Sequence, residues 1–117
     1  MWDKITSMEY EKILLQKLEK LFPDNDIRSK AVTILGEYGI ERYEQEPVRL
    51  RLAALKLFDG SLDELKKYIS YAKQDFRDVL SWAEYPRQSK KWSMPDGPKK
   101  EALVKADRAE YEKWLNT

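Results

Sequence analysis

Three charged residues have the types and the spacing that a polar site would need. When residues 47–58 are projected as a helix, Arg51 falls on an apolar face. A guanidinium buried there requires a partner, and Asp75 and Asp78 stand about one helical turn apart on the next expected helix. The spacing predicts a buried ion pair that fixes the two helices together. The alternative interpretation is a polar pocket in which Arg51 holds a small anionic ligand beside the two aspartates.

The absence of two residue types limits the chemistry further. The chain has 117 residues and contains neither cysteine nor histidine. This excludes thiol nucleophiles, disulfides, Ser-His-Asp triads, imidazole acid–base catalysis and zinc sites built on Cys or His. Asp75, Asp78 and Glu84 could ligate a hard cation, but no second carboxylate pair is spaced to close such a site. We therefore expect a protein that is not an enzyme, with no catalytic residue, cofactor or metal.

Residues 87–100 form a basic segment with one aromatic side chain. Arg87, Lys90 and Lys91 precede Trp92, and two further lysines follow. Lysines that contact phosphates and an aromatic ring that stacks on a base are typical of sequence-tolerant single-strand binders. The segment is thus a candidate for weak nucleic-acid contact. The alternative, a solvated loop with Trp92 against the core, is favoured by the acidic residues between 96 and 112 and by a net charge of only +1.

Aromatic residues supply the third candidate site. Four tryptophans and seven tyrosines are many for this length. Tyr71 and Trp82 lie on one flank of the expected helix 61–84, and Tyr85 follows just after it. Aromatic side chains beside charged ones are typical of interface hot spots. These three residues form our candidate surface for a partner protein or for self-association, unless the C-terminal helix covers them.

The helices that must position these residues are indicated by the apolar pattern. Apolar residues recur every three or four positions and no alternating β-branched run occurs, so we predict an all-α fold. Five helices are expected, near 6–22, 27–38, 47–58, 61–84 and 98–115. Helix 47–58 is apolar almost all round, with only Arg49 and Lys56 on a polar edge, which is typical of a helix covered on two sides. With 61–84 it should form an antiparallel hairpin at the centre of one orthogonal or bundle-like domain, residues 1–117. Residues 85–97 should be a loop, and the weak stripe of 98–115 predicts a peripheral helix.

Local signals support several of the helix ends. Ser61 with Glu64 is a capping-box pair, as are Thr6 and Glu9. Asp24 or Asp26 can cap the helix that follows. Pro47 suits the first position of a helix, and Gly39 suits the left-handed position beyond a helix end. Pro86 should end helix 61–84, because the residue before a proline avoids helical geometry.

Two motifs in the predicted hairpin resemble a group of small bacterial proteins of unassigned function. The motifs are VRLRLAALKL at 48–57 and DFRDVLSWAEYP at 75–86. They lie within residues 47–86, about a third of the chain. The resemblance implies a cytoplasmic, helical bacterial protein; it implies no activity, and no site residue carries over from it.

The remaining expectations concern location and role. No apolar run approaches the roughly 20 residues of a membrane span, and residues 1–4 do not begin a signal peptide. We expect a cytoplasmic protein without a membrane partner. The first hypothesis is a protein-interaction module that binds a partner or a second copy; the alternatives are a weak nucleic-acid binder through residues 87–100 and a small-ligand binder around Arg51, Asp75 and Asp78.

Overall fold

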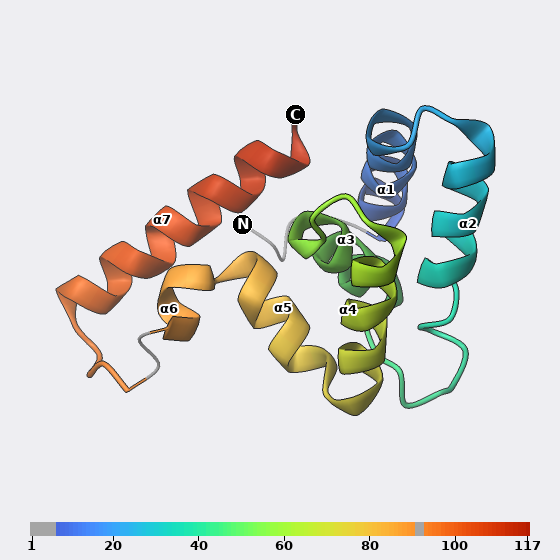
Figure 1. Ribbon diagram of the computed structural model, residues 1–117. Coiled ribbons are helices and arrows are strands. Elements are labelled where there is room, and N and C mark those ends of the chain that lie inside the picture. Colours follow the sequence, from blue (N-terminus) through green and yellow to red (C-terminus); the bar gives the residue numbers. More distant parts are fainter. Residues whose placement is uncertain (1–6, 91–92) are drawn as a thin grey trace.

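The computed structural model describes residues 7–90 and 93–117, and this part of the chain is all-α (Figure 1). Its seven helices are α1 (Ser7–Leu21), α2 (Asn25–Leu35), α3 (Pro47–Leu57), α4 (Leu62–Gln74), α5 (Phe76–Glu84), α6 (Pro86–Lys90) and α7 (Pro98–Leu115). The fold class is therefore as predicted, but the five-helix arrangement is wrong in two places. The expected helix 61–84 is divided into α4 and α5, and the expected loop 85–97 contains α6.

Helix α3 lies at the centre of the molecule. Five of its residues are at most 2% exposed, namely Leu50, Leu52, Ala53, Ala54 and Leu55. The helix packs against α1, α4 and α5 (Figure 1). The all-round apolar character of the sequence thus correctly predicted a covered helix. Buried residues of every described helix except α6 join one hydrophobic core, which is what a single domain requires.

The sequence signals at helix ends are confirmed where the structure describes them. The Ser61 hydroxyl accepts a hydrogen bond from the Glu64 N–H at 3.1 Å, and so caps α4. The Asp24 carboxylate caps α2 in the same way through the Ile27 N–H at 3.0 Å. Pro47 is the first residue of α3. Thr6, the expected cap of α1, lies outside the described residues.

Asp75 separates α4 from α5. Its backbone is extended, with φ −156° and ψ 102°, so the helical path is interrupted for one residue. Its carboxylate accepts a hydrogen bond from the Arg77 N–H at 3.0 Å, which satisfies one free amide at the start of α5. Aspartate competes with helical hydrogen bonding in this manner, and it favours caps over helix interiors. The continuous apolar stripe concealed this break, because the stripe keeps its phase on both sides of Asp75.

The connection between α2 and α3 depends on a glycine. Helix α2 ends at Leu35, earlier than predicted, and Gly39 then adopts a φ of 103°. A Cβ atom on Gly39 would stand 2.7 Å from the Pro47 Cβ and 2.9 Å from a guanidinium nitrogen of Arg51. Both the left-handed backbone and the close approach of α3 therefore require glycine here.

Helix α7 is peripheral only over its first half. In Figure 1 it runs along the side of the molecule, and its first turns extend beyond the body together with α6. Near its C-terminal end, Asp107, Tyr111 and Leu115 are buried. Trp114 also carries the Lys17 ammonium of α1 over its ring, 4.4 Å from the centroid. The second half of α7 thus belongs to the core, which corrects the expectation for 98–115.

Candidate functional site

Three aromatic rings meet on the outside of α4 and α5. Tyr71 and Trp82 pack edge to face with ring centroids 5.9 Å apart. Tyr68 lies 6.1 Å from Tyr71 and 6.5 Å from Trp82, again edge to face. Such pairs contribute roughly 0.5–1.5 kcal/mol beyond the burial of their area. Trp82 nevertheless remains 39% exposed, so a rigidly held indole faces solvent.

The break at Asp75 makes this cluster possible. Along one straight helix, Tyr71 and Trp82 would be separated by eleven residues, or about 16 Å of rise. Ring centroids 5.9 Å apart require α5 to turn back against α4, and the two helices do pack on each other. The sequence placed Tyr71 and Trp82 on one flank, but the bend brings them into contact.

Trp82 also forms one wall of a groove of about 670 Å³ between α5, α6 and the first half of α7. Tyr85 and Val104 add apolar surface, and Ser81, Gln88 and Ser89 add groups that form hydrogen bonds. Among the described residues that line the groove, only Asp78 is charged. Among residues 7–90 and 93–117, no cation forms an ion pair with Asp78. Two of the three predicted interface residues, Trp82 and Tyr85, thus line this groove, which we call the Trp82 groove, and Tyr71 supports it from behind.

The basic segment is used differently from what the nucleic-acid hypothesis assumed. The Arg87 guanidinium lies 2.9 Å from Asp107 and 2.7 Å from Glu110, both on α7. The Asp107 carboxylate is fully buried and also accepts the N–H groups of Arg87 and Gln88 at the start of α6. Arg87 therefore attaches α6 to α7. Lys90 is exposed on α6, while Lys91 and Trp92 lie outside the described residues.

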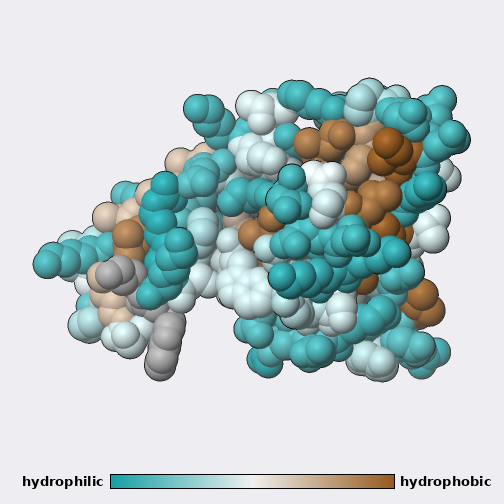
Figure 2. Space-filling view, viewed as in Figure 1, coloured by the Kyte–Doolittle hydropathy of each residue, from teal (hydrophilic) through white to brown (hydrophobic). Residues whose placement is uncertain are grey.

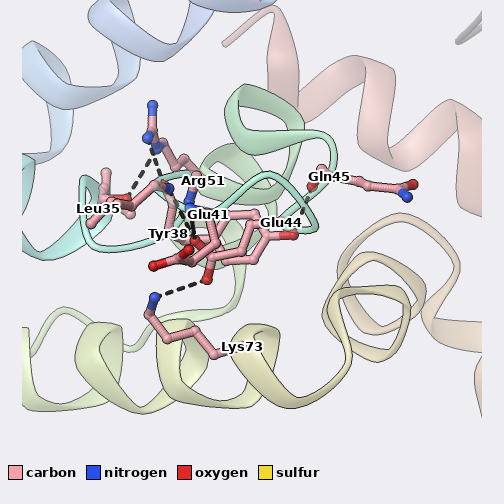
Figure 3. A network of polar contacts seen from close by, with 9 residues as sticks. Leu35, Tyr38, Glu41, Glu44, Gln45, Arg51 and Lys73 are labelled. Atoms are coloured by element: carbon pink, nitrogen blue, oxygen red, sulfur yellow. Dashed lines mark hydrogen bonds and ion pairs between the residues drawn. The ribbon is translucent and has the colours of Figure 1, made fainter.

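Arg51 does not pair with Asp75 or Asp78, so the predicted ion pair is wrong. Its guanidinium instead donates to the carbonyl oxygens of Leu35 at 3.0 Å and Tyr38 at 2.6 Å (Figure 3). The Leu35 carbonyl is at the C-terminal end of α2, where a helix has free acceptors and a partial negative charge, and the Tyr38 carbonyl lies in the turn that follows. Burial lowers the pKa of Arg51, and the negative charge of Glu11 acts in the opposite direction. The residue is a capping group for α2, and the polar cluster with the two aspartates is not formed.

Glu44 holds the same connection in place. One of its oxygens accepts the N–H groups of Gly39, Ile40 and Glu41 at 3.0–3.1 Å, and the other lies 2.8 Å from the Lys73 ammonium on α4 (Figure 3). The Glu44 side chain is only 2% exposed. The hydrogen bond from Lys73 and the three backbone N–H groups lower the pKa of Glu44 to about 2. Glu44 therefore fastens the 36–46 connection to α4.

We predict that Glu44→Gln destabilises the protein by about 1–2 kcal/mol at pH 7, since it keeps an acceptor but loses the charge. The pKa of Glu44 is lower in the folded than in the unfolded state. Its contribution is therefore complete above pH 4.5 and is lost as the pH falls toward 2. Urea unfolding at several pH values should show the two proteins converging over this range. A constant difference between them would contradict this role, and Glu41→Gln, one turn away, should have little effect.

A buried ion pair is present, but between residues that the sequence did not pair. Arg49 of α3 donates to both oxygens of Glu84 on α5, at 2.7 and 2.6 Å. The Glu84 side chain is 1% exposed. Burial, together with this carboxylate, raises the pKa of Tyr10 to about 12. On the same edge of α3, Lys56 donates to the Ala83 carbonyl at 2.6 Å, so the polar edge of α3 faces α5. The sequence signal was the shared edge of Arg49 and Lys56.

Neither a metal-binding cluster nor a membrane-spanning helix is found in the described part of the chain. Between residues 7 and 117, leaving out 91 and 92, no group of three or more Asp, Glu, His or Cys side chains is arranged to hold a metal ion. None of the helices seen in the structure is both long and apolar enough to cross a membrane.

Comparisons with known proteins add no relative. No protein-family model, curated protein or solved structure matches this chain. The resemblance of residues 47–86 to small bacterial proteins stays a prediction.

Proposed function

We propose that this protein is a non-enzymatic interaction module whose Trp82 groove binds a short segment of a partner protein. The observation that carries the proposal is the position of Trp82. Its indole is 39% exposed, is held by the rings of Tyr68 and Tyr71, and forms a wall of the 670 Å³ groove. An aromatic side chain that is already fixed loses little conformational entropy on binding, and tryptophan is enriched among binding hot spots.

The groove lining indicates the chemistry of the bound segment. An apolar side chain would pack on Trp82, Tyr85 and Val104. The side chains of Ser81, Gln88 and Ser89 would bond to the peptide backbone of the partner. Asp78, which forms no ion pair in the described structure because the neighbouring Arg77 pairs with Asp75, would pair with a lysine or arginine of the partner. A segment with one apolar and one basic residue fits this arrangement.

The test uses selection from a library of displayed random peptides on the full chain. Peptides that bind should carry an apolar residue near a Lys or Arg, and Trp82→Ala should weaken them about 30-fold, the loss typical of a hot spot. Tyr43→Ala is the matched control, because Tyr43 is 73% exposed and does not line the groove. Asp78→Asn should weaken only peptides with a basic residue. Peptides that bind wild type and Trp82→Ala equally would overturn the proposal.

The proposed setting is the bacterial cytoplasm, and two alternative functions lose residues on which they depended. A bacterial, cytoplasmic setting is supported by the resemblance of residues 47–86 and by the lack of cysteine. The nucleic-acid alternative loses Arg87, which two carboxylates hold. The small-ligand alternative loses its premise, because the Arg51 guanidinium donates to two backbone carbonyl groups and pairs with neither Asp75 nor Asp78.

A further inference from the structure

A second surface, formed by α1 and α2, is apolar at its centre. Leu15 of α1 is 64% exposed and Val32 of α2 is 49% exposed. Both line a shallow groove of about 290 Å³ that also includes Leu18. Figure 2 shows hydrophobic surface gathered at the end of the molecule where α1 and α2 lie. This face, which we call the α1–α2 face, is separate from the Trp82 groove on α5 to α7.

Charges of opposite sign lie beside this apolar centre. Glu19 follows Leu15 by one helical turn on α1, and Arg28 precedes Val32 by one turn on α2; both line the same groove. Residues 22–24 join the two helices, which pack side by side as an antiparallel hairpin (Figure 1). Counting from this turn, Leu15 is level with Val32 and Glu19 is level with Arg28. In the described structure neither Glu19 nor Arg28 forms an ion pair. The Arg28 guanidinium donates to the Phe22 carbonyl and to the Asn25 side-chain oxygen, which are both uncharged, so its charge has no carboxylate partner there.

We propose that the α1–α2 face binds a second copy of this chain. A twofold axis parallel to the two helices and passing between them would place α1 of each copy on α2 of the other. Leu15 would then contact Val32 of the second copy, and Glu19 would pair with its Arg28. The four helices would form an antiparallel bundle, and each contact would occur twice, as in an isologous dimer.

The arrangement of the charges indicates a second copy as the occupant. A face that binds itself across a twofold axis must carry its own complement, with an acid and a base at the same height on opposite sides of the axis. Glu19 and Arg28 satisfy this condition on two neighbouring helices. The patch is small, so it should form a weak dimer in the lower range of interface sizes. Each dimer would present two Trp82 grooves.

The first test measures the solution mass of the full chain by sedimentation velocity over a range of concentrations. The mass should rise from 13.9 kDa toward twice that value. Leu15→Asp should weaken the dimer more than about tenfold, because it places two carboxylates in an apolar contact. Since Leu15 is exposed, the thermal unfolding of the Leu15→Asp variant should match that of wild type. Trp82→Ala should still dimerise.

The second test exchanges the charges. Glu19→Arg and Arg28→Glu should each weaken the homodimer, because like charges then face each other. A mixture of the two variants should form heterodimers at concentrations at which neither variant dimerises. Arg28 also donates to the Phe22 carbonyl, so the thermal unfolding of Arg28→Glu is compared with that of wild type. The single variants Glu19→Arg and Val32→Asp leave Arg28 unchanged, and each should weaken the dimer on its own. A chain that stays monomeric, a dimer unaffected by Leu15→Asp, or one abolished by Trp82→Ala would overturn the proposal.

Discussion

Arg49→Met is expected to destabilise the protein by about 3–5 kcal/mol, because it leaves the Glu84 carboxylate buried without its cation. The Glu84 side chain is 1% exposed, and both of its oxygens accept hydrogen bonds from Arg49. The free energy of unfolding in urea, measured at pH 7 for wild type and variant, gives the effect directly.

A double variant distinguishes the buried charge from simple loss of packing. Arg49→Met combined with Glu84→Leu removes both charges, and it should recover much of the stability that Arg49→Met loses. Arg77→Met is the matched control, since the Arg77 side chain is 78% exposed in its pair with Asp75 and should contribute little. A loss below about 1 kcal/mol for Arg49→Met would show that the carboxylate is solvated or paired elsewhere.

Tyr111→Ala is the second change with a large expected effect, about 3–5 kcal/mol of lost stability. Tyr111 is fully buried, stacks on Trp114 with ring centroids 5.6 Å apart, and lies under the Lys56 ammonium. Its removal would leave a cavity where α7 meets the body of the protein. Thermal and urea unfolding of the variant would report the loss.

The control for this prediction lies on the same helix. Val104 is in the first half of α7, which extends from the body, and it is only half-buried. Val104→Ala should cost less than about 1 kcal/mol. If both variants had similarly small effects, the second half of α7 would be bound loosely, contrary to its place in the core.

Several features of the fold could be read from neighbouring residues alone. The caps at Asp24 and Ser61, the start of α3 at Pro47 and the bounds of α7 each depend on contacts within a few positions. Helix periodicity is also local, because it reflects which residues of one helix share a face. For the same reason the sequence indicated that α3 is covered and that Tyr71 and Trp82 share a flank.

The partners of Arg51 and Arg49 could not be predicted from the sequence. Both stand on α3, and the sequence marked the first as buried and in need of a partner. The sequence pattern predicted that its partners are aspartates on the next helix, whereas in the structure Arg51 donates to the Leu35 and Tyr38 carbonyls. Every residue has a backbone carbonyl, so the residue types do not indicate which carbonyls accept from Arg51. Arg49 was placed on a polar edge, and its partner Glu84 is 35 residues away.

The sequence by itself determined that the chain is helical, where α1, α3 and α7 begin and end, and which helix occupies the centre. The tertiary structure alone decided which of 22 cations meet which of 21 carboxylates, and that Trp82 lies against two tyrosines above a groove. The physical reason is the bend at Asp75. One residue in extended conformation changes the direction of α5, and with it every contact that α5, α6 and α7 make.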